Sequence, residues 1–189
     1  MKLVLLAAGA SRRMRGADKL LEPVDDEPLL RRQARAALAS GVGPVAVTLP
    51  PGAPSRWQAL DGLPLTLLPV DRASEGMSAS LRVAALWAAG SALMVAPADM
   101  PELDADDFAT LAGAFDGRAP LRATAADGTP GHPVIFPATL LADLGTLTGD
   151  AGARSVLHRH PPRLLALPDT HAITDLDTPE AWTHWRAGR

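Results

Sequence analysis

The sequence predicts an α/β fold, in which strands and helices alternate around a layered sheet. Short apolar runs typical of buried strands occupy residues 3–8, 45–49, 65–68 and 92–96. Segments with helical spacing lie between these runs, and glycine or proline follows several of the elements. With 189 residues, 47% of them apolar, the chain can build a sizeable core, and we expect residues 1–189 to form one domain.

The helices are placed by their spacing and by their expected caps. Residues 29–40 have apolar residues at helical spacing, and Gly41 follows as a stop. Further helices are expected at residues 55–60, 74–88, 104–115 and 138–144, near residue 158, and from residue 179 onward. The side chains expected to cap helices are Ser55, Ser78 or Ser80, Asp104, and Thr178 followed by Pro179. Later strands are expected at residues 121–126, 133–136 and 164–167.

The composition excludes several classes of protein. The net charge of −3 argues against a general nucleic-acid surface, and no apolar run reaches the length of a membrane span. The chain has no cysteine, which excludes disulfides, thiolate metal sites and a cysteine nucleophile. We therefore expect a cytoplasmic protein that binds neither nucleic acid nor membrane.

The stretch from residue 3 to residue 19 combines a strand, a loop of small residues and a cluster of cations. Arg12, Arg13, Arg15 and Lys19 lie within eight residues, directly after the loop that contains Gly9. Glycine allows close backbone approach, and loop N–H groups can face anionic oxygens, so we expect a phosphate site here. A signal peptide is the alternative, but its apolar core would be short and arginines follow at once. A solvated arginine-rich loop without function is the other alternative.

Carboxylates follow two of the expected elements. Asp99 comes just after the strand at residues 92–96, at the edge where open α/β sheets bind ligands. Asp99 could instead be a turn residue, but Asp104 is the better helix cap. Asp175 and Asp177 alternate with Leu176, so in extended backbone both carboxylates would face one way.

The first loop also resembles a family signature. The order Leu-Ala-Ala-Gly-x-Ser-x-Arg-Met is typical of the MobA-like nucleotidyltransferases, most similar to the molybdenum cofactor cytidylyltransferases. The matching residues are Leu6, Ala7, Ala8, Gly9, Ser11, Arg13 and Met14, with Lys19 at a family spacing. Arg15 departs from the pattern, because the family usually has glycine there. The resemblance covers nearly the whole chain and implies a Rossmann-like, mostly parallel sheet with helices on both faces, of the nucleotide-diphospho-sugar transferase type.

The resemblance also implies roles for individual residues. It assigns catalysis to Lys19, Arg13 and Asp99, and the metal to Asp99 and Asp177, with Asp175 as the alternative second ligand. The nucleotide-binding residues that it implies are Leu6, Ala7, Ala8, Gly9, Ser11, Arg13, Lys19 and Ser80. The acceptor-binding residues are Gly131, His132 and Pro133, and residues 149–154 match a further family motif, Gly-Asp-x-Gly-Ala-Arg.

The implied reaction is nucleotidyl transfer from CTP to the phosphate of molybdenum-bearing molybdopterin, with Mg²⁺, or Mn²⁺ as an alternative, and with release of pyrophosphate. A molybdoenzyme or its chaperone would then be a partner. Because the acceptor phosphate is already ionised, no protein nucleophile is needed, which suits a chain without cysteine.

Several other functions stay open at this stage. They are a GTP-dependent guanylyltransferase of the same pathway, a sugar-phosphate nucleotidyltransferase, and a nonenzymatic carrier of the molybdenum cofactor. The cytidylyltransferase of isoprenoid synthesis fits less well, because its loop has Pro-Lys where this chain has Asp18-Lys19.

Overall fold

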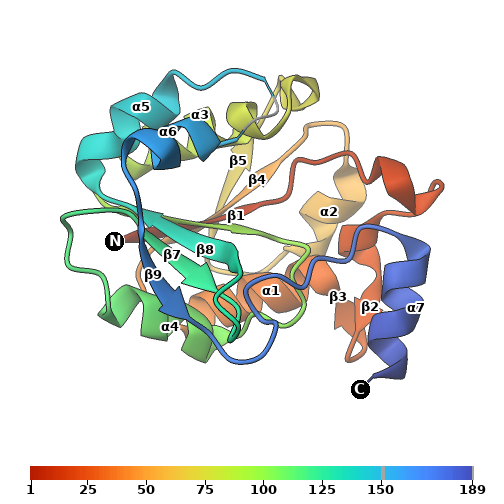
Figure 1. Cartoon of the computed structure of the whole chain (residues 1–189). Helices are drawn as coiled ribbons and strands as arrows, with labels where there is room; N and C mark the ends of the chain where they lie inside the picture. The colour runs from red at the N-terminus through yellow and green to blue at the C-terminus, as the bar shows by residue number, and fades with distance from the viewer. Residues whose placement is uncertain (150–151, 189) are drawn as a thin grey trace.

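The fold is built around one seven-stranded sheet (Figure 1). The computed structural model describes residues 1–149 and 152–188, without the side chain of Arg12. The strand order is β5-β4-β1-β6-β8-β7-β9. The bounds are Lys2–Leu6 (β1), Val45–Leu49 (β4), Thr66–Pro69 (β5), Leu93–Pro97 (β6), Leu121–Thr124 (β7), Pro130–Phe136 (β8) and Arg163–Ala166 (β9). Two further short strands, β2 (Pro23–Val24) and β3 (Glu27–Pro28), pair with each other.

The sheet is mostly parallel, as the family resemblance implies. Strands β5, β4, β1 and β6 run parallel to one another, β8 is antiparallel to both of its neighbours, and β9 is parallel to β7. Because β1 lies at the centre of the parallel part, Leu3, Val4 and Leu5 are completely buried. Their side chains alternate between the two faces of the sheet, so a continuous apolar run is the pattern that this strand requires.

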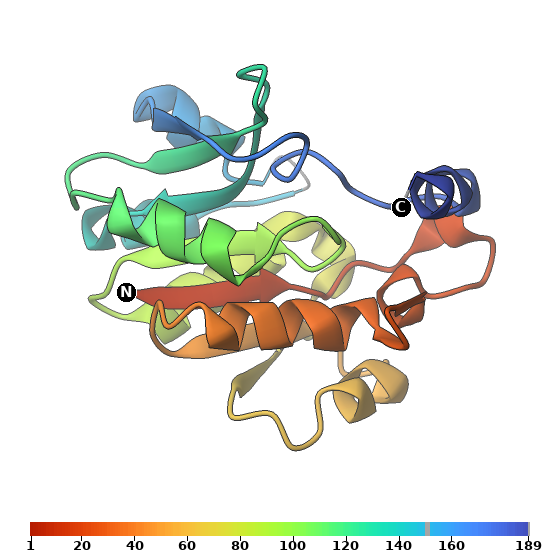
Figure 2. The same ribbon diagram turned by 90° about the horizontal axis from the view of Figure 1, so that it is seen from below.

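Helices cover both faces of the sheet, which confirms the expected layers (Figures 1 and 2). On one face, α1 (Leu29–Ala39) and α4 (Ala105–Gly113) pack against Leu3 and Leu5. On the other, α3 (Met77–Ala88), α5 (Leu141–Gly145) and α6 (Arg154–Arg159) pack around Val4. The short helix α2 (Pro54–Ala59) joins β4 to β5.

Two of the expected helix caps are confirmed. The side chain of Asp104 accepts from the amide of Asp107 at 2.9 Å, and the side chain of Asp107 accepts from the amide of Asp104 at 3.1 Å, which forms a capping box. The hydroxyl of Thr178 accepts from the amide of Ala181 at 3.2 Å and begins α7 (Pro179–Ala187).

The serine caps are wrong. Ser55 lies inside α2, which begins at Pro54 and has no side-chain cap. Ser78 and Ser80 lie inside α3. The N-cap position of this helix is occupied by Gly76, which has φ of 94° and directly precedes Met77. Glycine adopts a positive φ readily and is tolerated at the N-cap position, so Gly76 can begin this helix without a capping side chain.

Some element boundaries also differ from the prediction. The first strand ends at Leu6 rather than at residue 8, because the backbone beyond Ala7 leaves the sheet to line a pocket. Strand β7 ends at Thr124, and β8 begins at Pro130. In the motif of residues 149–154, Asp150 and Ala151 lie outside the described residues.

The C-terminal helix α7 closes onto the loop that follows β1. Trp182, which is 2% exposed, packs with Met14, Val24, Leu29 and Leu176. This cluster brings the segment before α7 beside the N-terminal loop, although the two are more than 150 residues apart in sequence. Among the described residues, none of the helices has the length and apolar character needed to cross a bilayer.

Candidate active site

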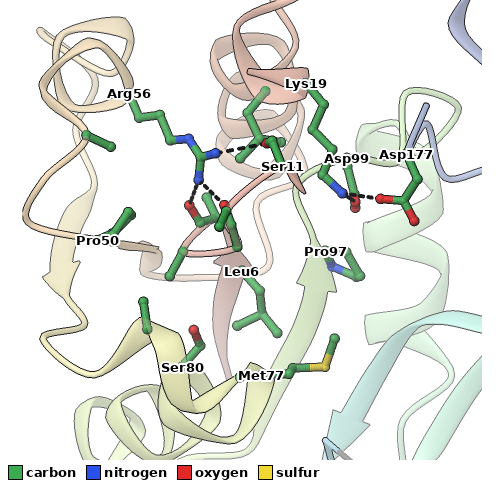
Figure 3. Close-up of a pocket in the computed structure, with 18 of the residues that line it drawn as sticks. Leu6, Ser11, Lys19, Pro50, Arg56, Met77, Ser80, Pro97, Asp99 and Asp177 are labelled. Carbon is green, nitrogen blue, oxygen red and sulfur yellow. Dashed lines mark hydrogen bonds and ion pairs between the residues drawn. The ribbon is translucent and has the colours of Figure 1, made fainter. Parts of the chain in front are cut away.

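A pocket of about 710 Å³ lies beyond the carboxyl ends of β1, β4 and β6 (Figure 3). Its walls are the loop after β1, Pro50 after β4, Arg56 of α2, the first turn of α3, and the loop after β6. Asp177 adds a side chain from the segment before α7. Parallel strands present their carboxyl ends at one edge of a sheet, which is where open α/β folds bind ligands.

The loop after β1 has open space beside the backbone of Gly9. A side chain at Gly9 would meet no atom within 4 Å, so its absence leaves free space beside the backbone. Arg15, the departure from the signature, has φ of 53° and ψ of 38°. This left-handed conformation is the one that glycine favours, and it costs another residue about 1–2 kcal/mol. Arg15 therefore adopts a backbone conformation that a glycine at this position would take more easily.

Lys19, Asp99 and Asp177 meet at one side of the pocket. The ammonium of Lys19 donates to Asp177 Oδ1 at 2.5 Å and also to Asp99 Oδ2. The side chain of Arg13, 68% exposed, donates to Asp177 Oδ2. Burial alone would lower the pKa of Lys19, but the charge of Asp99 and hydrogen bonds to both carboxylates raise it above its ordinary value. Lys19 is therefore charged at neutral pH.

The two carboxylates have the chemistry of a divalent-cation site. Asp99 Oδ1 is buried and makes no hydrogen bond to any described residue. Carboxylate oxygens are the ligands that Mg²⁺ and Mn²⁺ prefer, so Asp99 and Asp177 can hold such an ion where they now hold the ammonium of Lys19.

Asp175 is not among the described residues that line the pocket. Burial raises its pKa, and the charges of Asp177 and Asp99 raise it further, which shows that Asp175 lies near the pair. Of the two candidates for the second ligand, Asp177 is the one that contacts Lys19.

Sequence reasoning missed Arg56, which is 3% exposed and lines the pocket. Its guanidinium donates to the carbonyls of Ala7 and Gly9, both at 2.7 Å, and to the carboxylate of Asp18 at 2.6 and 2.8 Å. Its sequence context gave no signal, because an arginine in a short helix is ordinarily solvated. Asp18, which departs from the Pro-Lys pattern, is the residue that pairs with it.

At the opposite side of the pocket, Ser80 is 5% exposed and its side chain makes no hydrogen bond to the described residues. Ala8 also lines this part, and its methyl group packs against Val70 and Ala79. The loop after β1 is therefore held against α3 by small side chains.

The expected acceptor residues Gly131, His132 and Pro133 are not among the residues that line this pocket. A Cβ at Gly131 would lie 1.8 Å from the carbonyl oxygen of Ala172, so only glycine fits there. Burial and then the charge of Arg122 lower the pKa of His132 to about 4, against the opposing charge of Asp99. His132 thus lies near Asp99 as a neutral side chain, with Nδ1 buried and unpaired among the described residues.

A family model supplies the deciding comparison. The model described as "MobA-like NTP transferase domain" matches residues 3–164. The chain belongs to this family. It is a nucleotidyltransferase. A search of curated proteins by sequence finds no match.

Solved structures share the fold of this chain. A homologue of Rv0371c from Mycobacterium sp. strain JC1 is 29% identical, with 99% of this chain and 95% of that one covered and a TM-score of 0.86. Rv0371c of Mycobacterium tuberculosis H37Rv, described in complex with manganese, is 27% identical, with 97% and 96% covered and a TM-score of 0.80. A nucleotidyl transferase from Methanothermobacter, Mth528, is 23% identical, with 99% and 96% covered and a TM-score of 0.82, and shows the fold.

Proposed function

We propose that this chain transfers CMP from CTP to the phosphate of molybdenum-bearing molybdopterin and releases pyrophosphate, with residues 1–189 acting as one nucleotidyltransferase unit. The observation that carries the proposal is the meeting of Lys19, Asp99 and Asp177 at the edge of the pocket that the Leu6–Ser11 loop lines. The acceptor is suggested by the resemblance of the loop and of Gly131-His132-Pro133 to molybdenum cofactor cytidylyltransferases.

In this reaction, an oxygen of the acceptor phosphate forms a bond to the α-phosphorus of CTP. The bond from the α-phosphorus to the bridging oxygen breaks, and pyrophosphate leaves with that electron pair. The nucleophile is already an anion, so the chain does not need a general base. The neutral state of His132 agrees with this, because the residue neither supplies a strong base nor adds charge.

The main barrier is the approach of two anions, and the cations of the pocket lower it. Lys19 and Arg13 donate to phosphate oxygens and offset the charge that develops as pyrophosphate leaves. The N–H groups of the loop around Gly9, where a Cβ would meet no atom within 4 Å, orient the triphosphate.

Asp99 and Asp177 would hold Mg²⁺ or Mn²⁺, and the manganese complex of the mycobacterial relative supports this choice of ion. When bound, the ion neutralises phosphate charge and favours an in-line arrangement. Asp99 suits this role because one of its oxygens is buried without a partner among the described residues.

CTP is proposed as the donor because the loop reads Leu6-Ala7-Ala8-Gly9, as in cytidylyl members, whereas guanylyl members have Leu-Ala-Gly-Gly. The methyl group of Ala8, packed against Val70 and Ala79, restricts the backbone and narrows the space for a purine. We expect Ala8→Gly to reduce the ratio of kcat/KM for CTP to that for GTP, incompletely, because other contacts also select the base.

The test measures turnover of CTP, GTP and ATP by the purified chain with molybdenum cofactor and Mg²⁺. Release of pyrophosphate is the readout. The proposal predicts release with CTP and much less with the purines. Equal use of GTP would favour the guanylyltransferase. Turnover only with sugar phosphates would favour the sugar-phosphate enzyme, and cofactor binding without pyrophosphate release would favour a carrier.

A further inference from the structure

Arg56 donates hydrogen bonds from all three of its guanidinium nitrogens to groups around the pocket (Figure 3). It comes from α2, yet its guanidinium reaches the loop after β1 and donates to two backbone carbonyls of that loop. It also donates to the hydroxyl of Ser11 at 3.1 Å. An arginine with planar, fixed donors suits such a task better than a lysine, which is a point charge.

The two carbonyl contacts fix the direction of the loop's amide groups. In a trans peptide the C=O points away from the N–H of the next residue. Because the carbonyls of Ala7 and Gly9 face Arg56, the N–H groups of Ala8 and Ala10 point away from the guanidinium. Neither N–H donates to another described residue, so both are available to an anion.

Asp18 balances the charge of Arg56. Burial would raise the pKa of Asp18, but the hydrogen bond and charge of Arg56 lower it below its ordinary value. Ser11 also donates to Asp18 Oδ1 at 3.1 Å, which joins both ends of the loop to one ion pair. Asp18 directly precedes Lys19, so the pair also anchors the backbone from which Lys19 reaches its carboxylates.

We propose that Arg56 and Asp18 are positioning residues of the phosphate-binding loop: Arg56 holds the Ala7 and Gly9 carbonyls back so that the free amides receive the triphosphate, and Asp18 keeps Arg56 in place. This inference rests on the proposed function, because it takes the ligand of the loop to be a nucleoside triphosphate.

The rival explanation is that Arg56 binds a phosphate group directly. The two explanations predict opposite effects of Asp18→Asn. If Arg56 acts through the loop, the loss of its counter-ion loosens the loop and weakens binding. If Arg56 contacts phosphate, the same change frees the guanidinium and removes a repelling carboxylate, so binding strengthens.

The experiment measures, by calorimetry, the affinity of the full chain for inorganic tripolyphosphate and for CTP, each with Mg²⁺. We expect Arg56→Lys to weaken both by about tenfold, the scale of one lost hydrogen bond to a charged group. Asp18→Asn should weaken both in the same direction, and the CTP-to-GTP affinity ratio should stay unchanged in both variants. Thermal unfolding identifies a temperature at which each variant is folded. If Arg56→Lys does not fold, Asp18→Asn decides, because it keeps the guanidinium.

Arg31 provides a matched control. It donates to the carbonyls of Ala59 at 2.9 Å and Asp61 at 3.0 Å, outside the pocket, so Arg31→Lys should leave both affinities unchanged. Unchanged or tighter binding by Asp18→Asn overturns the positioning role while the proposed function stands. A wild-type chain that binds neither CTP nor tripolyphosphate refutes the proposed function, and the inference with it.

Discussion

Replacing Lys19 with methionine should have opposite effects on metal binding and on turnover. The ammonium of Lys19 lies between Asp99 and Asp177, where a divalent cation would bind in the proposed mechanism. A metal ion must therefore displace it. Methionine fills similar space without the charge, so the variant should bind Mn²⁺ more tightly in the absence of nucleotide. Turnover should fall by orders of magnitude, because the charge that offsets developing phosphate charge is lost.

The size of the effect follows from the burial of the three side chains. Lys19 and Asp99 are each 14% exposed and Asp177 is 20% exposed, so water screens their attraction only in part. At an effective dielectric constant of about 20, opposite unit charges about 4 Å apart attract by about 4 kcal/mol. Much of this attraction only offsets the hydration that the charged groups lose on burial. We therefore expect the variant to bind Mn²⁺ at least about tenfold more tightly, which corresponds to about 1.4 kcal/mol.

The assay is a titration of Mn²⁺ in which electron paramagnetic resonance reports the free ion. Lys2→Met is the matched control, because Lys2 is the other lysine of the chain and donates to the carbonyl of Trp87, away from the pocket. It should leave Mn²⁺ affinity unchanged. Weaker or unchanged Mn²⁺ binding by Lys19→Met would refute the exchange of lysine for metal.

Three further predictions concern metal, pH and the C-terminal helix. Asp99→Asn should abolish metal-dependent activity and Asp177→Asn should weaken it, because each loses an anionic oxygen. If the activity of both variants depends on Mg²⁺ concentration as that of the wild type does, the metal lies elsewhere. The pKa of His132 is lowered to about 4, so between about pH 6.5 and pH 4 the unfolded chain takes up a proton that the folded chain does not. Stability should therefore fall as pH falls through this range, by up to about 3 kcal/mol, and urea titrations should show a smaller loss in His132→Gln. Thr178→Ala should lower the free energy of unfolding by about 1 kcal/mol, because the amide of Ala181 loses its cap; an unchanged urea midpoint would contradict this.

The features that sequence predicted well are those set by local pattern. The apolar run of β1 indicates a strand buried on both faces, and the small residues after it indicate a loop, because these depend only on neighbours in the chain. Asp99 could be placed at the ligand-binding edge because it follows the apolar run of β6 by two residues. Asp104 and Thr178 cap their helices for the same local reason.

The features that sequence missed depend on contacts between distant segments. Arg56 lies 38 residues from Asp18, and no periodicity connects the two. Gly131 is required because the carbonyl oxygen of Ala172 occupies the place of a side chain. The prediction of serine caps for α2 and α3 was wrong because it rested on residue type alone. The start of a helix also depends on backbone conformation, and for α3 the N-cap is Gly76.

The balance of charge around the pocket indicates why a cation and a nucleotide should bind together. Among the described side chains, Lys19 and Arg13 are neutralised by Asp99 and Asp177, and Arg56 by Asp18. The pocket thus has cations but little excess positive charge for a triphosphate. If Asp99 and Asp177 take a divalent ion, as in the proposed mechanism, Lys19 and Arg13 lose their partners and their charges become available to phosphate. Without the ion, the same cations would have to leave partly buried carboxylates unpaired, which is costly. In the proposed mechanism, this arrangement favours nucleotide binding only when the carboxylates hold a metal, and it would link the metal dependence of the reaction to the position of a single lysine.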